Sequence, residues 1–196
     1  VDDASCDATA DRAEAAGACV LRLADNLGAW GATQSGLRMA LRRGYRRVVT
    51  CDADGQHHPD TIPALVDLHA RTGAEVVVGA CPDRGSRARH VAWRLFKTLT
   101  GLAVHDLTSG LRVYGHRSLK LLASPAGSLI DYQDVGVLLL LREHGHSVLE
   151  HPVCMTVRTD GHSRIFRNWF SVLEYMIFTL ILAACGNSRP GKEPRQ

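Results

Sequence analysis

The loop at residues 52–56 (DADGQ) holds the side chains whose types and spacing best suit chemistry. Asp52 and Asp54 stand two positions apart after the apolar run Val48–Cys51, so in an extended chain both carboxylates point to one side. Two carboxylates that close repel each other, and a hard divalent cation such as Mg²⁺ or Mn²⁺ relieves the repulsion and completes its coordination with phosphate oxygens. Gln56 adds a carbonyl oxygen. The pattern predicts a metal site, with a polar turn after a buried strand as the alternative.

A second acidic loop opens the chain, where Asp2 and Asp3 are followed by Ser5 and Asp7. Side-chain acceptors in such a loop suit a ribose or a nucleobase. The same residue types cap helices, and a helix is predicted directly after this loop. On the residues alone, helix capping is the favoured interpretation.

Two further segments combine opposite charges around a glycine. Segment 158–164 (RTDGHSR) places Arg158 and Arg164 six positions apart, a spacing that suits the clamping of a diphosphate, with a solvated turn as the alternative. Segment 106–112 (DLTSGLR) gathers an acid, two hydroxyls and an arginine. Asp134 lies on an otherwise apolar predicted helix, where a carboxylate needs a partner or a function, and structural pairing is the commoner explanation.

Alternating strands and helices are predicted to position these loops. Strands are expected at Cys19–Leu23, Val48–Cys51 and Val76–Gly79, and helices at residues 9–16, 31–43 and 59–71. This order predicts the α/β class, with a mostly parallel sheet covered by helices on both faces. Ligands in such sheets bind beyond the carboxyl ends of the strands, and the loop at residues 52–56 stands at one of these ends.

The second half of the sequence is less regular. It predicts helices over residues 86–100, 131–144 and 164–184 and strands over residues 111–114 and 147–157. Residues 166–185 form an amphipathic helix with Trp169 and Phe170 on its apolar face, which suits a membrane interface, with packing on the domain's own core as the alternative. Residues 186–196 are polar and carry Pro and Gly, so we expect a disordered tail.

The composition is that of an ordinary folded domain. The chain has 196 residues, of which 45% are hydrophobic and 22% charged, and this length suits one domain. A net charge of only +3 argues against a general nucleic-acid binder. Six scattered cysteines without a Cys-x-x-Cys pair indicate reduced thiols in contact with the cytosol. The chain opens with no signal-peptide pattern, and its longest apolar run is shorter than the ~20 residues of a membrane span.

The segments, taken in order, resemble glycosyltransferase family 2. The matching pieces are VDDASCDAT, LADNLGAWGATQSGLRMAL, GYRRVVTCDADGQHHPDTIPALV, EVVVGA, DLTSGLRVY and RTDGHSRIF. The likeness covers nearly the whole chain and is greatest to the polyprenyl-phosphate sugar transferases, the dolichol-phosphate mannose synthase-like branch. It implies a GT-A fold, which is Rossmann-like and binds a nucleotide sugar (GDP- or UDP-linked) with Mg²⁺ or Mn²⁺. It also implies inverting transfer of the sugar to a polyprenyl or dolichyl phosphate at the cytosolic face of the membrane.

The resemblance assigns individual positions to the nucleotide-sugar donor. These positions are Val1, Asp3, Asp52, Ala53, Asp54, Gln56, Arg158 and Arg164. Asp52, Asp54 and Gln56 resemble the ligands of the metal and the diphosphate, while Arg158 and Arg164 resemble the pair that grips the diphosphate. Val1 and Asp3 resemble the nucleoside contacts, and Ala53 lines the nucleotide.

Other positions resemble the acceptor side. Ser109 and Arg112 fall in the segment near the acceptor phosphate, and Asp134 falls in the acceptor pocket. The expected catalytic residues are Asp54, Arg112 and Asp134. Because a phosphate monoester with a second pKa near ~6 is already largely anionic at neutral pH, Asp134 is less needed as a general base.

The sequence departs from the family pattern at two places. The family's first strand and its Pro-x-x-Asn-Glu loop would lie upstream of Val1, so we expect residues 1–165 to form the catalytic domain without that strand. Cys81 stands where family members tend to have an arginine that contacts the donor; Arg84 or Arg87 could take its place. The departures leave open a catalytically inactive, membrane-associated binding module. A sugar-nucleotidyltransferase is a further alternative, although its Gly-rich phosphate loop is not found.

Overall fold

A four-stranded sheet forms the centre of the protein. The computed structural model describes residues 1–81, 104–130 and 135–156. The strands are β1 (Val48–Thr50), β2 (Val76–Ala80), β3 (Arg112–Tyr114) and β4 (Val148–Pro152), in the order β1-β3-β2-β4. β3 is antiparallel to both β1 and β2, and β2 is parallel to β4, so β1, β2 and β4 run in one direction. The predicted α/β class is confirmed, and the sheet is mixed: β1, β2 and β4 run in one direction as predicted, but the reversed strand β3 lies between β1 and β2 and pairs with both antiparallel.

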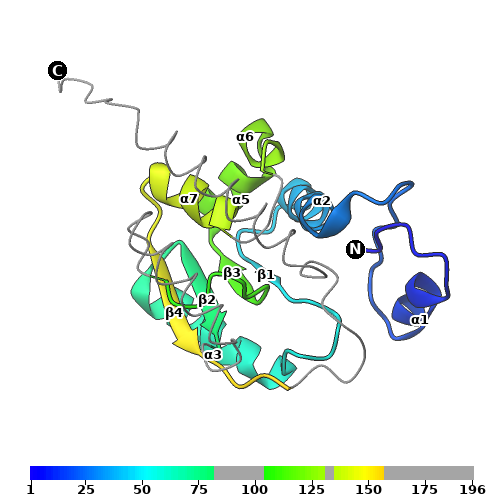
Figure 1. Ribbon diagram of the computed structural model, residues 1–196, viewed down its shortest axis with the longest axis horizontal. Coiled ribbons are helices and arrows are strands. Elements are labelled where there is room, and N and C mark those ends of the chain that lie inside the picture. Colours follow the sequence, from blue (N-terminus) through cyan, green and yellow to red (C-terminus); the bar gives the residue numbers. More distant parts are fainter. Residues whose placement is uncertain (82–103, 131–134, 157–196) are drawn as a thin grey trace, which may run out of the picture.

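Helices cover both faces of this sheet, as predicted. Figure 1 shows α2 (Gly28–Arg42), α5 (His116–Ala123) and α7 (Val135–Glu143) in a row along one side of the strands, and α3 (Ile62–Thr72) on the other. Val76 and Val78 of β2 pack into the core under the row of helices, and Val77 packs into the core under α3. This alternation follows from the two-residue repeat of a strand. Every residue of β2 is buried, as expected of a central strand.

The helix boundaries lie near the predicted ones. α2 begins three residues earlier than expected, and the helix expected at 59–71 divides into η1 (Pro59–Thr61) and α3. Gly73 ends α3 with a φ of 65°, a left-handed conformation that glycine adopts without steric cost. α5 and the short α6 (Pro125–Ser128) were not expected from the sequence.

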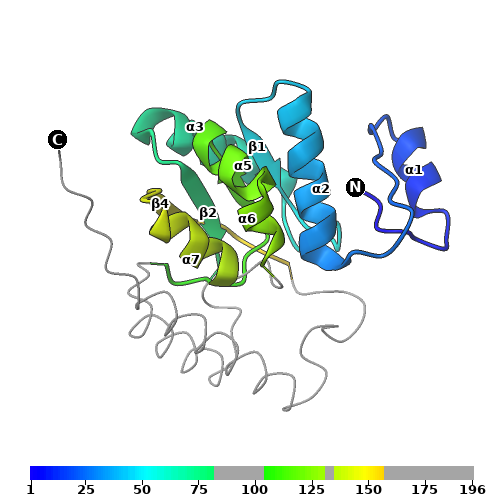
Figure 2. The same cartoon turned by 90° about the horizontal axis from the view of Figure 1, so that it is seen from above.

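The N-terminal segment lies beside the rest of the fold. Figures 1 and 2 both place α1 (Thr9–Ala15) on the far side of α2 from the sheet. The strand predicted at Cys19–Leu23 is wrong, because only Arg22 forms a bridge, to Asp2. The Asp2 N–H donates to the Leu21 carbonyl, and the Asp2 carbonyl accepts the Leu23 N–H. The chain then turns at Ala4, whose φ is 58°, and the pairing does not continue within residues 1–81.

Several predicted elements fall outside the described residues. These are the helix over residues 86–100, the first turn of the helix from residue 131, the amphipathic helix at 166–185, the tail at 186–196 and the domain boundary at residue 165. Among the helices within residues 1–81, 104–130 and 135–156, none is long and apolar enough to cross a membrane.

A half-buried group of titratable side chains lies at the amino end of β2. Glu75 has the Nδ1 of His146 at 3.9 Å, and the Nδ1 and Nε2 of His69 have no hydrogen-bond partner among the described residues. Burial is the main cause that lowers the pKa of both His69 and His146. The positive charge of Arg47 lowers the pKa of His69 further, and that of Arg117 lowers the pKa of His146 further. The negative charge of Glu75 acts in the opposite direction on both histidines.

These lowered pKa values predict a loss of stability in mild acid. A histidine whose pKa is lower in the folded state is protonated more readily in the unfolded state, so the free energy of unfolding falls as pH drops below the ordinary value of about 6.5. Denaturant titrations at pH 7.5 and pH 5.5 should show this difference. The double variant His69→Gln, His146→Gln should reduce it, whereas His58→Gln should not. An unchanged pH dependence in the double variant would contradict the assignment.

Candidate active site

The candidate site lies where the parallel strands β1, β2 and β4 end. Because these strands run in one direction, the loops that follow them meet at a common edge of the sheet. Those loops begin at Cys51, Cys81 and Val153. β3 runs the other way, so the segment 104–111 that precedes it arrives at the same edge. Ligands of open α/β sheets bind at such an edge.

The loop at residues 52–56 is a compact turn in which Asp52 is exposed and Asp54 is half-buried. Gly55 has a φ of 74°, and the Gln56 N–H donates to Asp54 Oδ1 at 3.1 Å. The Asp52 side chain is 54% exposed. Burial raises the pKa of the neighbouring Cys51 thiol, and the negative charges of Asp52 and Asp54 raise it further. The loop therefore carries a concentrated negative charge that attracts a cation.

The donor set of this loop fits Mg²⁺ or Mn²⁺. Asp52, Asp54 and Gln56 offer only oxygen side-chain ligands, the type that both ions prefer. Across residues 1–81, 104–130 and 135–156, no three His, Cys, Asp or Glu side chains gather closely enough to hold a metal by themselves. A site of two carboxylates is typical of Mg²⁺ sites that are completed by water and by substrate phosphates.

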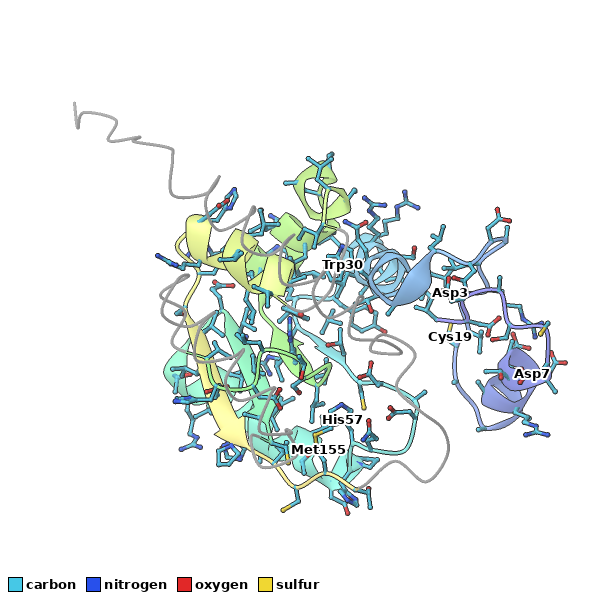
Figure 3. The ribbon with its side chains drawn as sticks, in the orientation of Figure 1. Asp3, Asp7, Cys19, Trp30, His57 and Met155 are labelled. Carbon is cyan, nitrogen blue, oxygen red and sulfur yellow. The ribbon has the colours of Figure 1, made fainter. Side chains whose placement is uncertain are left out.

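The chain that follows β4 fastens this loop in place. The Thr156 N–H donates to the Gln56 carbonyl at 3.0 Å, and the Thr156 hydroxyl donates to the Gly55 carbonyl at 3.2 Å. His57 and Met155 form a backbone bridge, and Figure 3 shows the two side by side. The loop is thus fixed to the two residues that precede the segment 157–164. Sequence reasoning did not find this contact, which joins positions about a hundred residues apart.

Gly110 forms the floor beneath Asp52. A Cβ atom at Gly110 would stand 2.8 Å from Asp52 Cγ and closer still to one carboxylate oxygen. The Gly110 carbonyl accepts a 2.8 Å hydrogen bond from the Thr50 hydroxyl, which ties segment 104–111 to the end of β1. Only a residue without a side chain lets the Asp52 carboxylate rest on this backbone.

Asp106 is the main organiser of segment 104–111. It is fully buried, and its carboxylate accepts the Cys81 N–H and both the N–H and the hydroxyl of Thr108, each at 3.1 Å. Glu150 of β4 accepts the Asp106 N–H at 2.8 Å. The sequence identifies segment 106–112 as a candidate site but assigns no separate role to Asp106. An acid followed two positions later by a hydroxyl residue is the local signal for such a turn.

Ser109 and Arg112 are both buried at the same edge. The Ser109 hydroxyl donates to the Gly79 carbonyl at 2.6 Å, and Arg112 donates to the carbonyls of Ser109 at 2.8 Å and Leu107 at 3.0 Å. Arg112 has a relative exposure of 0%. These hydrogen bonds to backbone carbonyls hold the conformation of segment 104–111 and join it to the end of β2. The acceptor-binding roles of both residues stay predictions.

The acidic loop at the start of the chain combines a helix contact with a buried acceptor. Asp3 Oδ1 accepts the Leu27 N–H at 2.7 Å just before α2, and Figure 3 shows Asp3 between the α1 segment and α2. Asp2 is buried, and its Oδ1 has no hydrogen-bond partner among the described residues. Val1 is exposed. Asp3 therefore contacts the chain before α2 and does not cap α1, the helix that follows this loop; the N-cap of α1 is Ala8, and the nearest side-chain contact is Asp7 Oδ1, which accepts the Thr9 N–H at 2.9 Å. The nucleoside contacts of Val1 and Asp3 stay predictions.

The structure brings only part of the predicted site together. Asp52, Ala53, Asp54 and Gln56 share one loop, and the segment that contains Ser109 and Arg112 lies against it through Gly110. Ala53 is exposed, and its position along the nucleotide stays a prediction. The predictions for Asp134, Arg158 and Arg164 lie outside the described residues.

Comparisons with known proteins point to one family. The profile of glycosyl transferase family 2 matches residues 1–120. The chain is 31% identical over 157 residues to the polyprenol monophosphomannose synthase of Mycolicibacterium smegmatis, which covers 74% of this chain and 59% of that protein. It is 30% identical over 181 residues to the undecaprenyl-phosphate mannosyltransferase of Micrococcus luteus, covering 84% of this chain and 74% of that protein.

A third relative carries a different sugar in its name. The dodecaprenyl-phosphate galacturonate synthase of Rhizobium johnstonii is 30% identical over 201 residues, covering 95% of this chain and 59% of that protein. The chain therefore spans less than two thirds of the length of the mycolicibacterial and rhizobial proteins. All three names describe enzymes that join a sugar to a polyprenyl phosphate.

Proposed function

This chain belongs to glycosyl transferase family 2, and on that premise we propose that it transfers a sugar from a nucleotide sugar to a polyprenyl phosphate. The donor is linked to GDP or UDP, and the reaction depends on Mg²⁺ or Mn²⁺. It takes place at the cytosolic surface of a membrane, against which the amphipathic segment 166–185 lies. Displacement at the sugar C1 by the acceptor phosphate inverts the configuration of that carbon.

One observation carries the proposal. The loop of Asp52, Asp54 and Gln56 lies at the carboxyl edge of the sheet and carries two carboxylates, of which that of Asp52 is exposed. Hydrogen bonds join it to Thr156, two positions before Arg158. The loop that carries the proposed cation ligands is therefore hydrogen-bonded to the chain just before the segment 158–164, which contains the arginines proposed for the diphosphate. A diphosphate that leaves with growing negative charge needs both kinds of group.

The residues of the loop have distinct tasks in the proposed reaction. Asp52 and Asp54 bind the cation, and Gln56 contributes a carbonyl oxygen. A divalent cation held by these side chains would supply positive charge to offset the negative charge that develops on the leaving diphosphate. Arg158 and Arg164 grip the same diphosphate, and arginine suits this because its planar fork donates two parallel hydrogen bonds to phosphate oxygens.

The acceptor needs positioning more than activation. A phosphate monoester is already largely ionised at neutral pH, with a second pKa near ~6. Ser109 and Arg112 shape the edge where this phosphate arrives, and Asp134 completes the acceptor pocket. The proposed enzyme therefore works without a dedicated general base.

Nucleotide binding gives the first test. A ligand present at a hundred times its dissociation constant stabilises the folded state by about 2.7 kcal/mol, which for a chain of this size raises the melting temperature by about 5–10 °C. We expect this shift with GDP or UDP and the corresponding sugars in Mn²⁺, and we expect EDTA to abolish it. Thermal unfolding of the protein with each nucleotide, in Mn²⁺ and in EDTA, measures both effects.

A transfer assay completes the test. With the nucleotide sugar that binds, radioactive sugar should pass to a polyprenyl phosphate and not to the matching polyprenol, because the alcohol lacks the ionised nucleophile. A shift that persists in EDTA would contradict the metal site. No shift with any nucleotide would instead favour the inactive, membrane-associated binding module.

A further inference from the structure

His57 is a buried histidine directly after the candidate metal loop at residues 52–56. Its side chain is 1% exposed, although it follows Gln56 directly and the next residue, His58, is exposed. Its Nε2 lies 3.7 Å from Asp52 Oδ2, and its Nδ1 has no hydrogen-bond partner among the described residues. Burying a polar ring in this way is unfavourable for folding, and an apolar side chain would fill the same space without that cost.

The surroundings of His57 fix where its ring lies. The backbone of His57 bridges to Met155, and the flanking Gln56 carbonyl accepts the Thr156 N–H at 3.0 Å (Figure 3). The main chain on both sides of the ring is therefore held by the chain after β4, and the ring itself is buried. Gly110 supports the Asp52 carboxylate from below. The Asp52 carboxylate thus lies between the backbone of Gly110 and the Nε2 atom of His57.

We propose that His57 is a positioning residue for Asp52, holding one carboxylate oxygen so that the other faces the cation. The inference rests on the proposed function and extends it to a residue that does not itself touch the metal. A ligand carboxylate that is held by a further donor keeps its orientation while the ion binds and leaves, and loss of such a partner typically weakens metal affinity by about 10–100-fold. Nε2 is the ring atom that faces Asp52, and at 3.7 Å it lies just beyond hydrogen-bond distance, so a small shift of the carboxylate on binding the ion would allow Nε2 to donate.

Two substitutions at His57 and one at His58 separate positioning from packing. His57→Phe keeps a ring of similar size and removes both nitrogens, whereas His57→Gln keeps an N–H donor. His58→Phe is the matched control, because His58 is exposed and its Nε2 lies 3.2 Å from the Thr156 hydroxyl rather than against Asp52. Melting temperatures in EDTA report folding without any metal.

The readout is Mn²⁺ affinity, measured by electron paramagnetic resonance of free Mn²⁺ in the presence of GDP or UDP, whichever stabilises the wild type. His57→Phe should weaken Mn²⁺ binding by about 10–100-fold. His57→Gln and His58→Phe should stay close to the wild type. Wild-type affinity in His57→Phe would overturn the inference, as would an equal loss in His57→Gln. A wild type that binds no Mn²⁺ would overturn the proposed function itself, before any variant is made.

The wild type offers a second readout if His57→Phe does not fold. Histidine ¹⁵N resonances can be followed while diamagnetic Mg²⁺ and the same nucleotide are added. The Nε2 signal of His57 should move, because its neighbour Asp52 takes up a cation, while the signal of His58 should move little. An unmoved His57 signal at saturating Mg²⁺ would overturn the inference.

Discussion

Asp52→Asn is expected to abolish metal-dependent donor binding and to lower kcat/KM by about 10²–10³-fold, the scale on which one lost electrostatic stabiliser acts. Asparagine has nearly the shape of aspartate but no charge. The loop would then offer the cation one carboxylate instead of two, and hard divalent ions depend on that charge. The thermal shift given by nucleotide and Mn²⁺ should disappear, while the nucleotide-free protein should melt as before, because the Asp52 side chain is 54% exposed.

A surface aspartate provides the control for this change. Asp67 on α3 pairs with Arg71 at 2.8 Å and its side chain is 61% exposed, so Asp67→Asn removes the same charge away from the edge of the sheet. It should leave nucleotide binding and transfer unchanged. If Asp52→Asn kept an EDTA-sensitive shift of wild-type size, Asp52 would not be a metal ligand.

Gly110→Ala is expected to reduce Mn²⁺-dependent donor binding and transfer by about 10–100-fold, even though the substitution changes no charged or polar side chain. The added methyl group would stand 2.8 Å from Asp52 Cγ, a separation that nonbonded carbons do not adopt, so the carboxylate must move. A displacement of about 1 Å at a reacting centre can cost about a hundredfold in rate. Mn²⁺ titration and initial transfer rates measure the loss.

A second glycine controls for the general effect of adding a methyl group. Gly44 follows α2 with a φ of 81°, and a Cβ atom there would meet nothing within 4 Å, so Gly44→Ala strains the backbone without touching the candidate site. It should lower the melting temperature and leave Mn²⁺ affinity unchanged. Gly110→Ala should instead lower the Mn²⁺ affinity and change the melting temperature little. Equal Mn²⁺ affinity in the two variants would contradict the close approach of Gly110 and Asp52.

Local patterns were sufficient to predict the strands and loops that bear the chemistry. Val48–Cys51 and Val76–Gly79 are short apolar runs bounded by polar residues, and the structure places β1 and β2 there. An acidic D-x-D loop directly after such a run stands at a carboxyl end whatever the rest of the fold does. Gly44 and Gly73 follow α2 and α3 with positive φ, the conformation in which a glycine commonly ends a helix. These signals lie within a few residues of the features they specify.

Long-range contacts escaped sequence reasoning for a physical reason. The strand expected at Cys19–Leu23 failed because a strand exists only where a neighbour pairs with it, and Asp2 alone does so. The reversed direction of β3 was equally invisible, since the two-residue side-chain repeat is the same whichever way a strand runs. Pairing partners and strand directions are properties of the assembled chain.

The sequence by itself determined the family, the α/β class and the side chains that could bind a cation, because residue types and their local spacing express these directly. Only the tertiary structure decided how those side chains are held. Gly110 lies under Asp52, His57 is buried beside it, and Thr156 fastens the loop from about a hundred residues away. The contacts of Gly110 and Thr156 join segments that meet only when the strands assemble, so no local spacing encodes them. His57 is close to Asp52 in the sequence, but its backbone bridge to Met155 again depends on the assembled chain.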